Sequence, residues 1–412
     1  MGYRLMAGQQ SLELLIGVRI PVPQPKNLVY TRFFFLYTKK RIKELTMFID
    51  LLLCVIGLAL LVYAADKLVE GASNLALNFG VSKMVIGLTI VAAGTSLPEF
   101  VVSLNSSIKG NPALSLGNVV GSNIMNVALI LGITALILPI NCNKAMIKRE
   151  VPIMIAVTAM AWIFAQTDKT ITPNEGIILF VIFIAYNIMS YIIGKREGQI
   201  AEELSEEADK IVKQETEEEK PPTMAFNIFC IIGGLVGMVV GSECLVRGAV
   251  SIATALGVSD EVIGLTLVAI GTSLPELATS VVAARKGQSD LSVGNVVGSN
   301  IFNITAIVGT AALVPMFMPN STPSQYLQVS SDMLSLHIPI MMVVAVALLP
   351  IMFTDMKITR KEGAFFTIVY IAYTIMLVHT ATAGKQVPEQ AKAKTVVEQT
   401  TTPSTPIALP EK

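Results

Sequence analysis

Charged side chains are scarce in this 412-residue sequence. Asp, Glu, Lys and Arg together make up 15% of the residues, against about 25% in an ordinary soluble protein. Hydrophobic residues make up 53%, and the mean hydropathy is +0.65. This composition excludes a typical water-soluble domain and indicates a protein that crosses a lipid bilayer several times. The formal net charge of zero gives no reason to expect a nucleic acid partner.

Histidine and cysteine are also rare. The two histidines, His337 and His379, lie far apart, and we interpret them as packing or interfacial residues. The four cysteines show no metal-ligand spacing, which predicts reduced thiols: Cys54, Cys142, Cys230 and Cys244. The motifs described below contain no pair of nucleophile and base, so we expect neither enzyme activity nor a cofactor.

The sequence does contain an internal repeat. Residues 85–132 reappear at 262–309 with a constant offset of 177 and no gap, and 29 of the 48 aligned positions are identical. The same register continues upstream to about residue 48. Two blocks stand out: Gly-Thr-Ser-Leu-Pro-Glu at 94–99 and 271–276, and Gly-Asn-Val-Val-Gly-Ser-Asn at 117–123 and 294–300.

Apolar segments of about 20 residues, the length that crosses the hydrocarbon core, occur ten times. The predicted spans are 48–66, 85–108, 113–139, 151–166, 175–193, 225–242, 262–284, 290–317, 334–353 and 363–380. Each repeat holds five of them, so the second copy enters the membrane from the opposite side. We predict an all-α membrane protein with ten transmembrane helices in two inverted five-helix repeats, 48–193 and 225–380.

The placement of lysine and arginine predicts the orientation. With the start of the first span outside, fifteen basic residues fall on cytoplasmic connections and three fall on outside ones. Three basic residues after the third span align at the offset of 177 with uncharged ones: Lys144 with Ser321, Lys148 with Gln325 and Arg149 with Tyr326. We expect a multi-pass protein of the cell membrane with both termini outside.

Three segments lie outside the repeats. Residues 1–46 contain three prolines and no signal-peptide cleavage site. They form either a genuine N-terminal extension or a mis-annotated start, with Met47 as the initiator. Residues 194–224 carry ten acidic and five basic residues, which predicts a solvated cytoplasmic linker. Residues 381–412, rich in Thr, Pro, Gln and Lys, predict a disordered tail.

Pro98 and Pro275 lie inside the second and seventh predicted spans. There a proline removes a backbone donor and clashes with the carbonyl group four residues earlier. We therefore expect helices 2 and 7 to be broken at Gly-Thr-Ser-Leu-Pro, which frees the carbonyls of Gly94, Thr95, Gly271 and Thr272 at membrane depth. Such carbonyls are tolerated only where they line a cavity or bind something, and a cation suits them.

An alternative is a plain proline kink whose freed backbone groups bond to the hydroxyls of Ser96 and Ser273. Glu99 and Glu276 argue against it. A carboxylate deep in the bilayer costs about 3 kcal/mol on insertion scales, so two at equivalent positions imply a compensating partner. No lysine or arginine lies within the motif spans, which leaves a mobile cation or protons.

The second block contains Gly-x-x-x-Gly, a close-packing signature of membrane helices. It also carries polar ligands, because Ser122 and Asn126 lie one helical turn apart, as do Ser299 and Asn303. Each pair presents a hydroxyl and an amide oxygen on one helix face. Two bidentate glutamates and two threonine carbonyls supply six oxygens, within the roughly six to eight that Ca²⁺ takes.

The paired blocks resemble the α-repeats of the sodium/calcium exchanger family of cation/calcium antiporters, especially its short prokaryotic members, over residues 48–380. The resemblance implies a calcium site formed by Glu99, Glu276 and the carbonyls of Thr95 and Thr272. It implies sodium sites, or the rest of the central site, formed by Ala92, Ser96, Ser122, Asn126, Ala269, Ser273, Ser299 and Asn303. Several relatives, including the potassium-dependent exchangers, have Asp in place of Asn303, which argues against potassium co-transport.

We therefore expect a secondary active antiporter that exchanges Na⁺ for Ca²⁺ across the cell membrane by alternating access. Its partners are these two ions and the lipid bilayer, with no obligatory protein partner. A proton/calcium antiporter and a cation channel stay open as alternatives. Serine and asparagine ligands favour sodium, because a proton needs no extra oxygens. Inverted repeats around a midplane site favour a transporter over a channel.

Overall fold

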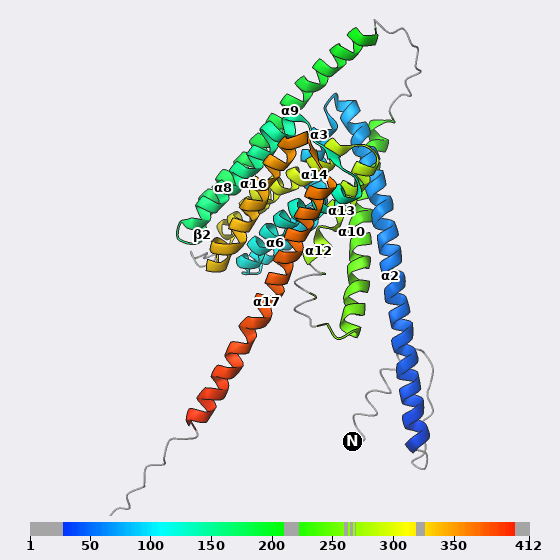
Figure 1. Cartoon of the computed structure of the whole chain (residues 1–412), viewed down its shortest axis with the longest axis vertical. Helices are drawn as coiled ribbons and strands as arrows, with labels where there is room; N and C mark the ends of the chain where they lie inside the picture. The colour runs from blue at the N-terminus through cyan, green and yellow to red at the C-terminus, as the bar shows by residue number, and fades with distance from the viewer. Residues whose placement is uncertain are drawn as a thin grey trace, which may run out of the picture.

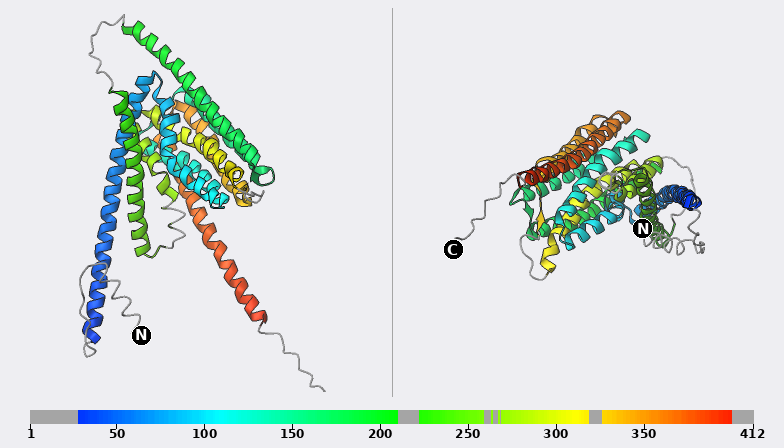
Figure 2. Two further views of the ribbon diagram at one scale, coloured as in Figure 1. Left: turned by 180° about the vertical axis from the view of Figure 1, so that it is seen from behind. Right: turned by 90° about the horizontal axis from the view of Figure 1, so that it is seen from below.

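The protein is a bundle of long helices (Figures 1 and 2) in a computed structural model that describes residues 28–209, 222–258, 263, 267, 269–318 and 326–399. Among the described residues, seven helices are long and apolar enough to cross a membrane, or eight if the bent pair Lys83–Thr95 and Leu97–Ile108 is one span. The expected helical membrane protein is confirmed at this level. Of the other predicted spans, 151–166 corresponds to a helix of only 16 residues, and 262–284 is incompletely described.

The elements of the first half, in chain order, are α2 (Leu28–Phe79), α3 (Lys83–Ile86), η2 (Gly87–Val91), α4 (Ala92–Thr95), α5 (Leu97–Ile108), α6 (Pro112–Met125), η3 (Asn126–Leu131), α7 (Gly132–Ile137), β1 (Ile140–Asn141), η4 (Met146–Glu150), α8 (Val151–Gln166), β2 (Thr170–Ile171) and α9 (Pro173–Asp209). The π-helical segments η2 and η3 extend helices that continue on either side of them.

The second half contains α10 (Met224–Ala255), α12 (Ala269–Thr272), α13 (Leu274–Arg285), α14 (Ser289–Phe302), η6 (Asn303–Val308), α15 (Gly309–Leu313), η7 (Val314–Phe317), β3 (Leu327–Gln328), η9 (Met333–His337), α16 (Ile338–Asp355), β4 (Lys357–Ile358) and α17 (Arg360–Gln399). This order follows that of the first half. The two halves are joined by two antiparallel strand pairs, β1 with β4 and β2 with β3.

The repeat offset changes within the second half. The π-helices η3 and η6 begin 177 positions apart, but η4 and η9 begin at Met146 and Met333, which are 187 positions apart. The second half thus has a connection ten residues longer, in a segment that includes residues 319–325. This corrects the alignment at a constant 177: Lys144, Lys148 and Arg149 correspond to Ser331, Ser335 and Leu336. The loss of positive charge persists, because these residues are also uncharged.

Helices α2 and α10 lie side by side along one edge of the bundle (Figure 1). Glycines allow their backbones to touch. A Cβ atom on Gly57 would lie 2.6 Å from the backbone nitrogen of Leu245, and one on Gly241 would lie 2.8 Å from that of Leu61. These contacts explain why the repeat preserves Gly57 as Gly234, where a Cβ atom would lie 2.8 Å from the carbonyl of Ala64.

Most of the described residues outside the repeats are helical. Helix α2 runs without a break from Leu28 through Met47, and α9 continues to Asp209, inside the predicted linker. Helix α17 continues to Gln399, although the sequence predicts a disordered tail from residue 381. Alanine, glutamine and lysine, which have high helix propensity, are frequent there. Residues 1–27, 210–221 and 400–412 lie outside the described residues.

His337 and the four cysteines are among the residues that we interpret as structural. His337 is hydrogen-bonded through Nδ1 to the hydroxyl of Tyr373 at 3.1 Å, and all four cysteines are free. The middle of the bundle, in contrast, is polar. Helix α14 packs against helices of both halves, and its Ser299 and Asn300 are buried. This buried polar region leads to the candidate site.

Candidate cation-binding site

Both predicted helix breaks are present. Helix α4 ends at Thr95 and α5 begins at Leu97, with a bend of 48° between the segments on either side. Helix α12 ends at Thr272 and α13 begins at Leu274. Pro98 and Pro275 fall in the first turn of the following helix, where a missing N–H group costs no hydrogen bond.

Each break places a glutamate in the first turn of a helix, where the unpaired N–H groups favour a negative charge. Glu99 and Glu276 are each only 1% exposed. Oε1 of Glu99 accepts a hydrogen bond of 2.7 Å from the hydroxyl of Ser273, and Oε1 of Glu276 accepts one of 2.9 Å from the hydroxyl of Ser96. The serine hydroxyls thus bind the carboxylate of the other half, which excludes the plain proline kink.

Four buried oxygen atoms at these motifs have no donor. They are Oε2 of Glu99, Oε2 of Glu276, Oδ1 of Asn126 and Oδ1 of Asn303. No ion pair among the described residues includes either glutamate. A buried acceptor without a partner costs about 1–3 kcal/mol. A set that contains acceptors only is therefore suited to a cation.

The atoms that could bind a cation at this site are all oxygens. In the part of the chain that the structure describes, no three His, Cys, Asp or Glu side chains gather in a group that would hold a metal. Two carboxylates with amide and hydroxyl oxygens match hard cations such as Na⁺ and Ca²⁺. Transition metals usually recruit imidazole or thiolate ligands.

Asn126 and Asn303 begin the π-helical segments η3 and η6. Such π-turns often mark functional sites. Nδ2 of Asn126 donates a hydrogen bond of 2.9 Å to Oδ1 of Asn300, and Nδ2 of Asn303 donates one of 2.9 Å to Oδ1 of Asn123. Both bonds cross between the two halves, so the second block of each half packs against that of the other.

The serines of the same helices are also buried. Ser122 is 5% exposed, and Ser299 is fully buried with its hydroxyl 3.5 Å from the carbonyl oxygen of Ala92, to which it donates. Ala92 is fully buried too, and its counterpart Ala269 is the first residue of α12. The structure therefore brings Ser299 of one half against Ala92 of the other, as a shared site requires.

The two threonines occupy the ends of the broken helices. Thr95 is fully buried, and its hydroxyl donates a hydrogen bond of 3.1 Å to Oδ1 of Asn295. Thr272 is partly buried. The carbonyl of Gly271, which we expected to be free, accepts a hydrogen bond of 2.6 Å from Ser242 of α10. That expectation was wrong for Gly271, because a neighbouring helix supplies the missing donor.

Four asparagines of the site were not among the predicted ligands. Asn123 and Asn300 bind Asn303 and Asn126, as described above. Nδ2 of Asn118 donates to the carbonyl of Glu99 at 3.2 Å, and Nδ2 of Asn295 donates to that of Glu276 at 3.5 Å, both within one half, while Oδ1 of Asn295 accepts from Thr95 of the other half. Asn118 aligns with Asn295, and Asn123 aligns with Asn300, in the two copies of the repeat. This identity indicated that they matter, but helix periodicity could not predict their hydrogen-bond partners.

A hollow of about 470 Å³ lies between α5, α10 and α12. Thr272, Val101 and Glu243 are among its lining residues. Thr272 directly precedes Ser273, the residue that holds Glu99, so the hollow reaches the edge of the buried site.

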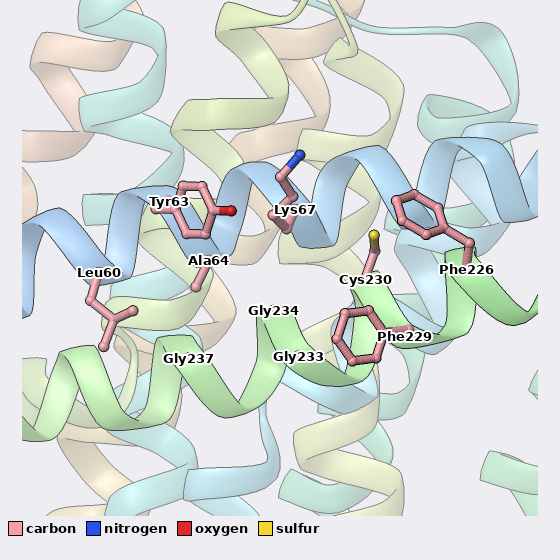
Figure 3. A pocket seen from close by; sticks show the side chains of 10 residues that line it. All are labelled: Leu60, Tyr63, Ala64, Lys67, Phe226, Phe229, Cys230, Gly233, Gly234 and Gly237. Carbon is pink, nitrogen blue, oxygen red and sulfur yellow. The ribbon is translucent and has the colours of Figure 1, made fainter. Parts of the chain in front are cut away.

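A second hollow, of about 350 Å³, lies between α2 and α10 (Figure 3). It is lined mostly by apolar side chains and glycines, and its one charged lining residue is Lys67. A cation there would meet a like charge and no carboxylate. This hollow is therefore not the cation site.

Comparison with known proteins agrees with this geometry. The sodium/calcium exchanger protein family matches residues 49–192 and 226–379. The chain belongs to this family. It is 33% identical over 359 residues to the sodium/calcium exchanger MaX1 of Methanosarcina acetivorans, covering 80% of this chain and 98% of that protein. It is 38% identical over 264 residues to the inner membrane protein YrbG of Escherichia coli, covering 64% of this chain and 79% of the relative.

Solved structures of the sodium-calcium exchanger NCX_Mj have the same fold. The structure soaked with zero Na⁺ and Ca²⁺ matches with a TM-score of 0.66 and 31% identity, over 80% of this chain and 99% of that one. The structure soaked with 10 mM Na⁺ and 10 mM Sr²⁺ matches with a TM-score of 0.64, 32% identity and coverages of 79% and 97%. The exchanger is thus a helical membrane transport protein and not an enzyme.

Proposed function

We propose that this exchanger moves Ca²⁺ across the cell membrane against Na⁺ by alternating access. The observation that carries the proposal is the pair Glu99 and Glu276. Both are buried, each is held through one oxygen by the other half, and each has a second oxygen with no donor. Two carboxylates match the charge of one divalent ion, or accept monovalent ions in its place.

In this proposal, Glu99 and Glu276 bind Ca²⁺ together with the backbone carbonyls of Thr95 and Thr272, which gives six oxygen ligands. The flanking side chains and carbonyls bind Na⁺: those of Ala92, Ser96, Ser122, Asn126, Ala269, Ser273, Ser299 and Asn303. The unpartnered Oδ1 atoms of Asn126 and Asn303 support this assignment. Asparagine at 303 supplies no extra charge, which argues against a potassium ion as a further substrate.

The fold that we propose is ten transmembrane helices in two inverted five-helix repeats, 48–193 and 225–380. Two observations support this fold. The elements occur in the same order in the two halves, and strand pairs join one half to the other. We place both termini outside and the acidic linker 194–224 in the cytoplasm. The distribution of lysine and arginine supports this orientation. With the corrected offset of 187, the basic residues after the third span still align with uncharged ones.

Alternating access is supported by a difference between equivalent positions of the two halves. Val101 and Val102, beside the hollow of about 470 Å³, are 52% and 38% exposed. Their counterparts 177 positions later, Ala278 and Thr279, are 9% and 0% exposed. The first half is thus open where the second is packed. Exchange of these two conformations between the halves would close one entrance and open the other.

The decisive experiment is Ca²⁺ uptake into proteoliposomes that contain the purified exchanger. An outward Na⁺ gradient should drive uptake without any pH gradient. Uptake driven by a pH gradient in the absence of Na⁺ would establish the proton/calcium antiporter instead. Single-channel current steps in a planar bilayer would establish a channel.

A further inference from the structure

Four buried asparagines form a hydrogen-bonded chain across the interface between the halves, in the order Asn126, Asn300, Asn123 and Asn303. The two at its ends, Asn126 and Asn303, carry the oxygens that have no donor. The Oδ1 atoms of the other two, Asn123 and Asn300, accept hydrogen bonds from Asn303 and Asn126 at 2.9 Å, and Nδ2 of Asn300 lies 3.5 Å from Sδ of Met154. Their Nδ2 atoms donate to a backbone carbonyl of the other half, Asn123 to that of Asn300 and Asn300 to that of Asn123, both at 3.3 Å.

Backbone carbonyls fix the direction of every hydrogen bond in this chain of four asparagines. The carbonyl oxygen of Asn123 accepts hydrogen bonds and never donates, so Asn300 must turn its NH₂ group toward it. Oδ1 of Asn300 then faces Asn126. Because this oxygen is also only an acceptor, Asn126 must present its NH₂ group to Asn300.

One orientation then remains for the ligand amide. With Nδ2 of Asn126 directed at Asn300, its Oδ1 points the other way and has no donor. Reversal of the Asn126 amide would set two acceptor oxygens against each other at the position of the 2.9 Å bond. The same series of hydrogen bonds, which we call the relay, runs from the carbonyl of Asn300 through Asn123 to Asn303.

We propose that Asn123 and Asn300 are positioning residues that turn the amide oxygens of Asn303 and Asn126 toward the transported cations. Each half thereby orients a ligand of the other half. The proposal rests on the proposed function, because it assumes that these oxygens bind Na⁺ during exchange. It differs from that function in assigning a role to two residues that carry no unpartnered oxygen themselves.

The protein's own hydrogen bonds set this orientation, so it needs no bound ion. An asparagine amide that is free to rotate would present its NH₂ group to a cation in part of the population, and an ion would have to reverse it. Holding the oxygen in place removes this cost and raises affinity without an added contact. Loss of the positioning residue should therefore weaken Na⁺ dependence while the ligand itself is still present.

The experiment is a double-mutant cycle on Asn126→Ala and Asn300→Leu, read out in proteoliposomes as the Na⁺ concentration that gives half-maximal exchange. Asn300→Leu alone should raise this concentration about tenfold, as Asn126→Ala should, within the range of measured coupling between contacting residues. The double variant should match the single ones, because Asn300 acts only through Asn126. Thr305→Val is the matched control: Thr305 is fully buried in η6, and its hydroxyl donates at 2.6 Å to Ile301 of its own helix.

Three outcomes would overturn the proposal. In the first, Asn300→Leu lowers thermal stability in detergent and leaves the Na⁺ dependence unchanged, as a purely structural link between helices would. In the second, the effects of the two substitutions multiply in the double variant. In the third, Thr305→Val shifts the Na⁺ dependence as much as Asn300→Leu.

A symmetric cycle on Asn303→Ala and Asn123→Leu tests the same relay in the other half. It decides the question if Asn300→Leu does not fold. Failure of the proposed function is distinguishable, because the unsubstituted exchanger would then show no Na⁺-driven Ca²⁺ uptake at all.

Discussion

Ser96 and Glu276 lie 180 positions apart in the chain, and the serine hydroxyl donates a hydrogen bond of 2.9 Å to the glutamate carboxylate. Ser273 and Glu99 make the reciprocal bond at 2.7 Å. Each glutamate at the break of one half is therefore held by the serine at the break of the other. The two sequence motifs form one site rather than two.

Removing either serine hydroxyl should weaken Ca²⁺ binding. A hydrogen bond to a charged group contributes about 1.5–3 kcal/mol, so Ser96→Ala or Ser273→Ala should raise the Ca²⁺ concentration for half-maximal uptake by roughly 10- to 100-fold. Thr158→Val, which removes a buried hydroxyl bonded at 2.7 Å within its own helix, should leave it unchanged. Wild-type Ca²⁺ dependence in both serine variants would show that these bonds do not shape the site.

Replacing Glu99 or Glu276 by glutamine should abolish Ca²⁺ uptake and leave the protein folded. Without ions, the variants should be as stable as the parent or more so, because each loses a buried carboxylate oxygen that has no donor, a burden of about 1–3 kcal/mol. Thermal unfolding in detergent and uptake in proteoliposomes measure the two effects. Normal uptake by either purified variant would remove that glutamate from the site.

Glu150 provides the matched control for these two substitutions. It is a fully buried carboxylate too, but it pairs with Arg149 and accepts a hydrogen bond of 2.8 Å from the hydroxyl of Tyr186. Glu150→Gln should therefore lower thermal stability and retain Ca²⁺ uptake per folded molecule. Loss of uptake without loss of stability would extend the ion site to Glu150.

Exchange should move net charge. One Ca²⁺ and two ionised glutamates sum to zero, while family resemblance implies that more than two Na⁺ replace one Ca²⁺. The Na⁺-loaded exchanger is then positive, and one charge crossing the membrane field is worth about 2.3 kcal/mol per 100 mV. A potassium diffusion potential that makes Na⁺-loaded vesicles positive inside should accelerate Ca²⁺ uptake. A rate indifferent to voltage would indicate electroneutral exchange.

An ion pair should control the packed entrance. Asp66 of α2 contacts Lys286 after α13 at 2.6 Å, whereas the counterpart Glu243 pairs within its own helix with Arg247 at 2.5 Å. We expect Asp66→Asn to favour opening at the packed end. A cysteine introduced at Ala278, which is 9% exposed, should then react faster with a maleimide. The increase should be at most about fivefold, because a partly exposed ion pair contributes no more than about 1 kcal/mol to the closed form.

The open entrance supplies the control for this measurement. A cysteine at Val101, which is 52% exposed beside the hollow of about 470 Å³, should react readily in both backgrounds. Equal reaction rates at position 278 with and without Asp66 would mean that the ion pair does not hold this entrance closed.

A chain that begins at Met47 should insert and transport as well as the full chain. The family match begins at residue 49, although α2 continues upstream to Leu28. Expression level and Na⁺-driven Ca²⁺ uptake of the two chains test this directly. A shortened chain that is folded but inactive would assign a function to the first 46 residues.

The features that depend on local chemistry could be predicted from the sequence alone. Pro98 and Pro275 predicted the two helix breaks, because the missing N–H group and the ring act on the proline's own helix. Glu99 and Glu276 stood out because a carboxylate in the bilayer requires a partner.

The half that supplies each hydrogen-bond partner could not be predicted from the sequence and follows from the way the helices pack. Asn123 and Asn300 share one motif with Ser122 and Ser299, and no periodicity distinguishes an ion-facing oxygen from an amide that orients its neighbour. The same holds for the carbonyl of Gly271, taken by Ser242, and for the longer connection that shifts the offset to 187. These features arise where helices distant in the chain pack together, and the local pattern of residues does not predict such contacts.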